Sequence, residues 1–445
     1  RIEKFKAIFK NPTELEYVRQ GLQQFRSRQE SFKTKNVSLE DLQYIENQNV
    51  LQQIYDRNNT SSLNFSSIEE INRGLEDYLF EGDILLTRQQ IDELLNARKK
   101  RQASMPEYRW DKTKPIYFSF DPSVDFIIIS LFRSATKFWS DNICLNFVES
   151  KATPYIQIIA DYTNQYGSSC WSFRGRTPGT TSQQLSLGSG CQNFGTVTHE
   201  LAHALGIAHE HARYDRDSYI TIIPENMDQF YINQFIKQST LTSNNYGLPY
   251  DWGSVMHYRD RPGINGKIYA LAKDRIYQST MGGQYQPTFK DIYLMNLYYN
   301  CMCASGVACQ NGGFRNPKNC NICICPSGFG DPLCNQRQTA ENGAIDFGVV
   351  LTAPLGKRIE ITIQSVSGKC VPGCIWGSLE LKVRNFVLTG ARYCCRSNVA
   401  ANPILVTNDN FAIVSVYNLA YEHSFSLKYR YSKQFKIGNK HFKIT

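Results

Sequence analysis

Three histidines fall within an eleven-residue stretch whose spacing is that of one bent helix holding a metal ion. The stretch reads His199-Glu200-Leu-Ala-His203-Ala-Leu-Gly206-Ile-Ala-His209. On a helix, His199 and His203 project from the same face, and Gly206 can adopt the positive φ that ends the helix and returns His209 to the metal. Three imidazoles with one position left open are typical of a catalytic zinc, because structural zinc sites are usually closed by four protein ligands. We therefore expect one zinc ion per chain.

Glu200 follows the first predicted ligand, where its carboxylate can take a proton from water on the metal. The alternative for each histidine taken alone is an ordinary helix residue that binds nothing. Three of the chain's seven histidines share the ligand spacing, however, and this coincidence favours the metal site. His211 has the wrong phase for the metal, so we expect it beside the site or on the surface.

The fourteen cysteines are clustered rather than spread along the chain. None occurs before Cys144 and six lie between Cys303 and Cys334, a clustering on an even count that is typical of oxidising compartments. The chain begins with Arg1 and has no apolar stretch that could span a bilayer. We therefore expect a soluble, secreted, extracellular protein whose signal peptide has been removed or left out. Four N-glycosylation acceptors in the first hundred residues agree with this: Asn36, Asn58, Asn59 and Asn64.

A length of 445 residues predicts several domains of an overall α+β multidomain class. In order, we expect a polar helical segment, an α+β domain, a small disulfide-rich module, an antiparallel β-sandwich and a basic tail, at residues 1–101, 102–301, 302–335, 336–432 and 433–445. Within the α+β domain, residue patterns predict strands at 115–120 and 155–159 and a helix at 125–141. Strands of the sandwich are predicted at 359–363, 379–383, 411–416 and 424–429.

The charges of the chain point to processing more than to a charged partner. The net charge of +9 is modest and predicts no nucleic-acid partner, and the basic tail is either a solvated end or a weak polyanion contact. The first 101 residues carry 16 basic and 16 acidic side chains and end in Arg98-Lys-Lys-Arg101. This run is either an exposed helix end or a cleavage site for an activating protease. Its place at a change of composition favours cleavage after Arg101, which would leave Gln102 as the new amino terminus.

A second motif brings the chain close to a known family. Ser254-Val-Met256-His257-Tyr258 follows the histidine stretch, and the two together resemble the metzincin metalloproteases. Glu210, Arg213 and the Ser-x-Met-His-Tyr form narrow the resemblance to the astacins. The resemblance implies a zinc endopeptidase in which Tyr258 joins the three histidines as a ligand, Glu200 is the general base and Met256 forms an apolar floor below the metal.

The resemblance also covers the cysteines and the later domains. In the catalytic domain it implies the disulfides Cys144–Cys301 and Cys170–Cys191. The cysteine-rich run that follows resembles an EGF-like module and the β-region after it resembles a CUB domain, an order that looks most like the nematode astacins. In these two modules we expect the pairs Cys303–Cys320, Cys309–Cys323, Cys325–Cys334, Cys370–Cys395 and Cys374–Cys394.

The first segment contains a short sequence that the family uses for latency. Phe80-Glu-Gly-Asp83 reads by itself as an ordinary turn, but it resembles the Phe-x-Gly-Asp motif of astacin pro-segments. The resemblance implies that Asp83 is the inhibitory zinc ligand of a zymogen. After cleavage near Arg101, it implies that the new amino terminus pairs with Glu210, which could otherwise be a plain helix-end carboxylate.

Several properties of the substrate stay open at this stage. We expect the strand at 155–159 to pair with an extended protein substrate. Arg259-Asp-Arg-Pro-Gly replaces the family's usual aromatic-Ser stretch, which leaves the specificity of the pocket in doubt. Extracellular matrix, cuticle collagen, host matrix and another zymogen are all compatible substrates, and the protein partner of the CUB domain is unknown. The competing interpretations are a matrix-organising protein without catalysis, although no ligand or base is missing, and a different metzincin, which Glu210 and Tyr258 disfavour.

Overall fold

The computed structural model describes residues 2–7, 9, 12–29, 37–57, 66–96, 108–160, 169–240, 242–262, 266–330, 332–338, 347–400, 404–431 and 438–444. Within these ranges, no helix has both the length and the apolar character of a membrane span. The candidate glycosylation and cleavage residues lie outside the described residues: Asn36, Asn58, Asn59, Asn64, Arg101 and Gln102.

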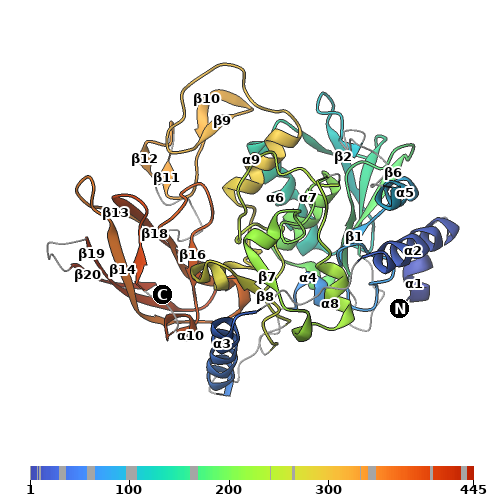
Figure 1. The fold of residues 1–445 in the computed structure, drawn as a ribbon. Coiled ribbons are helices and arrows are strands. Elements are labelled where there is room, and N and C mark those ends of the chain that lie inside the picture. The colour runs from blue at the N-terminus through green and yellow to red at the C-terminus, as the bar shows by residue number, and fades with distance from the viewer. Residues whose placement is uncertain are drawn as a thin grey trace.

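The α+β domain is built on a mixed sheet, which lies on the right of Figure 1 with the strand order β1-β5-β6-β4-β2-β3. β2, β3, β4 and β6 run parallel to one another, whereas β5 is antiparallel to β6. β1 belongs to the first segment of the chain and joins the sheet beside β5. The bounds are β1 (Ile84–Leu85), β2 (Ile116–Phe120), β3 (Phe147–Glu149), β4 (Tyr155–Ile159), β5 (Cys170–Phe173) and β6 (Ser182–Leu187).

The expectation that the strand at 155–159 pairs with substrate is wrong. β4 lies between β6 and β2, so its backbone is hydrogen-bonded on both sides. Among the described strands of the α+β domain, β5 and β3 are at the edges, and β1 covers β5. Strand order depends on pairing between residues far apart in the chain, so the sequence pattern of one strand does not reveal its neighbours.

Two helices cover the sheet and form the core of the domain with it. α6 (Phe126–Asn142) begins where the Asp125 carboxylate accepts a hydrogen bond from the Ile128 amide, as expected of a capping aspartate. Its buried face packs with β2 and with α7 (Phe194–Ala204) into one apolar cluster. The remaining elements of this domain are β7 (Ile220–Ile222), α8 (Gln229–Gln234), β8 (Ala270–Ala272) and α9 (Phe289–Tyr298).

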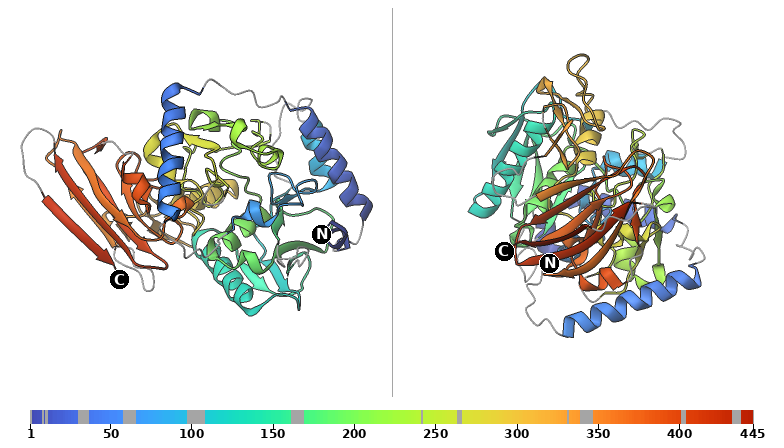
Figure 2. Two further views of the ribbon diagram at one scale, coloured as in Figure 1. Left: turned by 90° about the horizontal axis from the view of Figure 1, so that it is seen from below. Right: turned by 90° about the vertical axis from the view of Figure 1, so that its left-hand side faces the viewer.

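The first segment wraps around the α+β domain instead of forming a separate body (Figure 1). α2 packs on α5, and α3 lies between the domain and the C-terminal strands (Figure 2). Ile45 of α3 is buried against Ile223, Ile268 and Leu271 of the domain. The helices are α1 (Ile2–Ala7), α2 (Pro12–Ser27), α3 (Leu39–Arg57), α4 (Ile68–Ile71) and α5 (Arg88–Asn96).

The C-terminal third contains a small disulfide-rich module and a β-sandwich. The module holds two short hairpins and three disulfides. The sandwich has two four-stranded sheets, β13-β18-β15-β16 and β17-β14-β19-β20, whose inward apolar side chains form one core. Its only described α-helix is α10 (Arg396–Ala400). The strands of this third are β9 (Phe314–Asn316), β10 (Asn319–Ile324), β11 (Phe329–Gly330), β12 (Gln336–Arg337), β13 (Phe347–Thr352), β14 (Ile359–Ser367), β15 (Gly377–Lys382), β16 (Ala391–Tyr393), β17 (Leu405–Val406), β18 (Phe411–Asn418), β19 (His423–Tyr431) and β20 (Gly438–Ile444).

The sandwich continues beyond the boundary expected at residue 432. Residues 438–444, which we expected in a basic tail, form β20 and pair antiparallel with β19. The physical reason is that the outer edge of β19 offers a row of backbone donors and acceptors, which another strand can satisfy.

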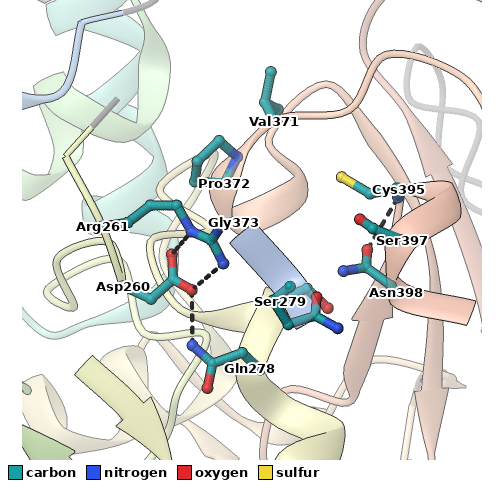
Figure 3. A pocket seen from close by; sticks show the side chains of 11 residues that line it. Asp260, Arg261, Gln278, Ser279, Val371, Pro372, Gly373, Cys395, Ser397 and Asn398 are labelled. Carbon is teal, nitrogen blue, oxygen red and sulfur yellow. Dashed lines mark hydrogen bonds and ion pairs between the residues drawn. The ribbon is translucent and has the colours of Figure 1, made fainter. Parts of the chain in front are cut away.

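The sandwich is docked on the α+β domain through a shared apolar cluster, to which buried side chains of both units belong, and through polar contacts beside it. Arg392 forms a buried ion pair with Glu380 at 3.0 Å, and its guanidinium lies over the rings of Tyr285 and Tyr417. A pocket at this junction is lined by residues of both units and by Gln48 of α3 (Figure 3). The two units and α3 therefore meet at one place.

Candidate metal centre

The three predicted histidine ligands converge on one point. The Nε2 atoms of His199 and His203 are 3.0 Å apart, and each lies 3.2 Å from Nε2 of His209. Two nitrogen ligands of a tetrahedral zinc lie about 3.3 Å apart, from Zn–N distances of about 2.05 Å. All three rings are buried.

The other ring nitrogens show which atoms face that point. Nδ1 of His199 lies 2.7 Å from the Val255 carbonyl, and Nδ1 of His203 lies 2.7 Å from the Ile207 carbonyl. Since a carbonyl oxygen only accepts, both Nδ1 atoms carry the proton and both Nε2 atoms present lone pairs. Lone pairs that converge in a buried space require a cation. The site fits a single zinc ion.

α7 positions two of these ligands, and the turn after it positions the third. The Asn193 side chain accepts a hydrogen bond from the Thr196 amide and caps the helix. The helix ends at Ala204, and Gly206 follows two residues later with a φ of +105°. A Cβ at this position would lie 2.6 Å from the Tyr298 hydroxyl, so both conformation and space demand glycine. The chain then turns and brings His209 back to the other two ligands.

Asp83 of the first segment completes the cluster. Its Oδ2 lies 3.0 Å from His199 Nε2 and 3.2 Å from His209 Nε2, and its Oδ1 lies 3.3 Å from His203 Nε2. The side chain is fully buried. Although burial raises the pKa of Asp83, the charge of the nearby His209 side chain holds it well below its usual value. A carboxylate oxygen is an accepted zinc ligand, so these four side chains form one closed donor set.

Glu200 lies beside the cluster without a partner of its own. It is fully buried, and neither carboxylate oxygen has a hydrogen bond to any residue that the structure describes. Burial raises the pKa of Glu200 well above its usual value, and the charge of Asp83 raises it further. A buried carboxyl group that binds nothing is costly, which makes Glu200 a functional candidate and not a structural one.

Comparisons with known proteins agree with this geometry. The model of the astacin peptidase family matches residues 102–300. The zinc metalloproteinase nas-29 of Caenorhabditis elegans is 32% identical, over 82% of this chain and 78% of that protein. The chain belongs to the astacin family.

Other matches have different coverage. The zinc metalloproteinase nas-31 of Caenorhabditis elegans is 37% identical over 77% of this chain and 63% of that protein, so the chain spans less than two thirds of this relative. Among solved structures, high choriolytic enzyme 1, a hatching enzyme zinc-protease from the medaka fish Oryzias latipes, is 27% identical. That match covers 45% of this chain and 98% of the other, with a TM-score of 0.39.

Tyr258 of the astacin domain contacts the first segment in this structure. Its hydroxyl donates to Asp83 Oδ2 at 2.7 Å and also lies 3.0 Å from the Glu81 carbonyl. Its role as a zinc ligand therefore stays a prediction. His211 is buried beside it, with the two rings stacked at 4.5 Å, and is not on the surface. Met256 is buried in the apolar cluster of the domain, and its role as a floor below the metal stays a prediction.

Sequence reasoning missed Glu81 as a partner of the metal site. Its Oε2 accepts the Nδ1–H of His209 at 2.9 Å, and its Oε1 accepts a hydrogen bond from the Gln238 amide at 2.6 Å. Glu81 stands at the variable position of Phe-x-Gly-Asp, and it has a positive φ of 52°. The family motif allows any residue at this position. The only hint in the sequence that Glu81 contacts the metal site was therefore its place directly before Gly82 and Asp83.

Glu210 is held by groups that the sequence did not predict. Arg213 and the Asp251 amide donate to Oε1 at 3.0 and 2.9 Å, and the Lys290 ammonium contacts Oε2. Although burial raises the pKa of Glu210, Lys290 and Arg213 hold it below its usual value. The amide of Glu210 also donates to the Met256 carbonyl at 2.9 Å. The expected pairing with a new amino terminus involves Gln102, which is outside the described residues.

The seven disulfides of the structure have the pairings expected from the astacin resemblance. Two are in the astacin domain, three in the small module and two in the sandwich. They are Cys144–Cys301, Cys170–Cys191, Cys303–Cys320, Cys309–Cys323, Cys325–Cys334, Cys370–Cys395 and Cys374–Cys394.

Proposed function

We propose that the chain is the latent precursor of a secreted zinc endopeptidase that hydrolyses peptide bonds of extracellular proteins. The observation that carries this proposal is the closed donor set of Asp83 with His199, His203 and His209. Two hydrogen bonds fix the backbone around Asp83. The side-chain amide of Asn72 donates to the Gly82 carbonyl, and the backbone amide of Ser172 donates to the Asp83 carbonyl, each at 3.0 Å. Residues 1–101 thus act as an inhibitory pro-segment.

Peptide hydrolysis divides the chemistry between the metal and the side chains. Zinc, when bound, supplies Lewis acidity that makes water nucleophilic near neutral pH and polarises a carbonyl. Glu200, which has no other partner among the described residues, accepts the proton of the attacking water at a carboxylate oxygen and passes it to the leaving amine. The Tyr258 hydroxyl, which donates to the Asp83 carboxylate here, donates to the developing oxyanion once the pro-segment has left.

The edge of β5 is the place for the substrate backbone. In the latent chain, β1 of the pro-segment occupies this edge, with Ile84 opposite Ser172 and Leu85 opposite Phe173. Release of the pro-segment exposes the backbone donors and acceptors of β5, which an extended peptide can satisfy by adding a strand. The pro-segment therefore blocks both the metal and the substrate-binding edge.

Arg259 makes an acidic substrate side chain the favoured class. Arg259 follows Tyr258 and is buried under α4 of the pro-segment, where Glu70 Oε2 lies 3.8 Å from the guanidinium. The neighbouring Glu69 is fully buried, and Arg259 is the largest influence that favours its ionised form. The carboxyl groups of Glu69 and Glu70 in the pro-segment thus lie near the Arg259 guanidinium. A substrate carboxylate would replace them after activation.

Activation and the accessory domains belong to the same proposal. An activating protease cleaves after Arg101 in a basic run at the end of the pro-segment. The small module with three disulfides serves as an EGF-like domain and the sandwich with two serves as a CUB domain, which binds a protein partner outside the active site. Secretion is supported by the seven disulfides, which persist in oxidising compartments. Candidate substrates are extracellular matrix and cuticle collagen.

The test compares wild-type protein with Glu200→Gln after trypsin activation, using casein as substrate. Wild type should cleave casein after activation and lose this activity with a chelator. The Glu200→Gln variant should keep one zinc per chain and lose turnover, by about 10³-fold or more if Glu200 is the general acid and base. If activated wild-type protein contains zinc and still leaves casein uncut, the result would favour the interpretation of the chain as a binding protein without catalysis.

A further inference from the structure

Lys290 and Glu210 form an ion pair inside the astacin domain, with side chains only 3% and 4% exposed. Glu210 directly follows the ligand His209 in the chain. Its carboxylate already accepts three donors, namely the Lys290 ammonium at Oε2 and the Arg213 guanidinium and Asp251 amide at Oε1. The latent chain therefore satisfies Glu210 before any cleavage occurs.

Lys290 is the cation that balances Glu210. Arg213 also forms an ion pair with Asp215 through two hydrogen bonds of 2.9 and 2.7 Å, so its charge is shared between Asp215 and Glu210. The nearby carboxylates of Asp251 and Asp291 accept hydrogen bonds from backbone amides and hydroxyl groups, which are neutral donors. Because removal of one partner of a buried pair leaves an uncompensated charge, the position of Glu210 depends on the cation that α9 supplies.

The same turn of α9 also supports the opposite side of the metal site. Asp291 accepts hydrogen bonds from the Ser254 hydroxyl at 2.6 Å and from the Val255 amide at 2.9 Å. The Val255 carbonyl accepts the Nδ1–H of His199. Outer partners of this kind orient the ligands of a metal and tune its affinity. Consecutive residues of one helix, Lys290 and Asp291, thus support the segments around two ligands.

A separate observation concerns the amino terminus that activation would expose. Cleavage after Arg101 places Gln102 first. In a terminal glutamine, the α-amino nitrogen attacks the carbon of its own side-chain amide. A new C–N bond forms, the C–NH₂ bond breaks, ammonia leaves with the proton, and a neutral lactam remains. This chain can therefore lose the charge of its new amino terminus, whereas the side chain of Lys290 takes no part in this reaction.

We propose that Lys290 supplies, from within the astacin domain, the cation that holds Glu210 and the adjoining His209, so that the cleaved enzyme does not depend on a charged amino terminus. The inference rests on the proposed function, since it concerns the same metal site. Lys290 is a positioning residue, because it acts on His209 through Glu210 and touches neither the metal ligands' Nε2 atoms nor the substrate edge.

The first test uses the wild-type sequence around the metal. One protein is cleaved to expose Gln102, and a second carries an altered cleavage site that leaves two extra residues before Gln102. The kcat/KM and the rate of zinc loss to a chelator should agree within about twofold between the two forms. A fall in kcat/KM of about tenfold or more in the extended form would show that the free amino terminus is required, and would overturn the inference.

The second test changes the lysine. Lys290→Gln should lower kcat/KM and speed zinc loss, each by about 10- to 100-fold, as loss of an outer partner of a metal ligand does. Lys290→Arg should restore part of both. Lys137→Gln is the matched control, because Lys137 forms an exposed ion pair with Asp141 and should change neither readout.

The two tests remain informative when one readout fails. Unchanged kinetics and zinc retention in Lys290→Gln would contradict the inference. If that variant does not accumulate as folded protein, the extended wild-type form still decides. If activated wild type cleaves nothing, the proposed function fails, and zinc loss in the Lys290 variants still tests whether this residue supports the metal site.

Discussion

At the scale of single residues, the proposed latency depends on one carboxylate at the metal site. Asp83 faces the Nε2 atoms of three histidines and accepts a hydrogen bond from the Tyr258 hydroxyl. Glu81 adds a second attachment through Nδ1 of His209. Both side chains are buried, and both belong to the segment that we propose leaves on activation. Under that proposal their contacts serve the latent state alone.

Asp83→Ala should give the uncleaved chain measurable activity. Loss of a charge-assisted contact costs about 2 kcal/mol of pro-segment docking, which raises the open fraction about 30-fold. The measurement is hydrolysis of a fluorogenic peptide by uncleaved protein in which cleavage after Arg101 is blocked. Asp77→Ala is the control, since Asp77 is exposed on the same segment. Equal activities of the two uncleaved variants would contradict the role of Asp83.

At the scale of elements, the metal site depends on how α7 ends. Leu205 and Gly206 close the helix, and the Ile207 amide donates to the Ala202 carbonyl at 3.0 Å. The turn at the end of α7 directs the following residues back toward the face of the helix that carries His199 and His203. The Ile207 carbonyl is also the acceptor for Nδ1 of His203. The turn therefore orients one ligand and delivers another.

Gly206→Ala should destabilise the astacin domain and weaken zinc binding. The added Cβ meets the Tyr298 hydroxyl and the residue keeps a positive φ, which together should cost about 2–3 kcal/mol of the free energy of unfolding. Gly179→Ala separates the two causes, because Gly179 has a φ of +75° with nothing within 4 Å of its Cβ. The checks are thermal unfolding and zinc content. A smaller effect at Gly206 than at Gly179 would refute the steric argument.

At the scale of the whole molecule, the proposed pro-segment contacts several parts of the chain. β1 pairs with β5, Glu70 of α4 lies near Arg259, α2 packs on α5, and α3 reaches the junction of the astacin domain with the sandwich. Arg275 of the domain forms an ion pair with Asp41 of α3 and lies over the Tyr44 ring. The proposed cleavage after Arg101 would leave these contacts in place, so we expect release of the proposed pro-segment to be a separate step.

Release of the cleaved pro-segment should become easier as pH rises from about 5 to 7.5. Burial raises the pKa of Glu69 from 4.5 to about 7 in the docked state, with Arg259 opposing and Glu70 adding to the shift. Below pH 4.5 the group is protonated whether docked or released. Between the two values only the released segment ionises, so docking weakens with rising pH, by about 3 kcal/mol in full.

This dependence is measured as pro-segment retained on cleaved enzyme by gel filtration across that pH range. Glu69→Gln should remove most of the pH dependence, because the amide does not ionise. Glu46→Gln is the control, since Glu46 is exposed on α3. Retention that stays constant or grows with pH in the wild type would rule out Glu69 as the source.

The sequence by itself determined the local part of the metal site. His199, His203 and Gly206 lie within two turns, where helix geometry relates spacing directly to direction, and the helix and strands at 125–141 and 155–159 were found within a residue of their bounds. Tertiary structure alone decided the rest of the site and of the strand order.

The contacts of Glu81 with His209 and of Lys290 with Glu210 join residues 128 and 80 positions apart. The interior place of β4 and the addition of β20 likewise depend on pairing between distant strands. Such contacts form only when the whole chain packs, and no local pattern records them.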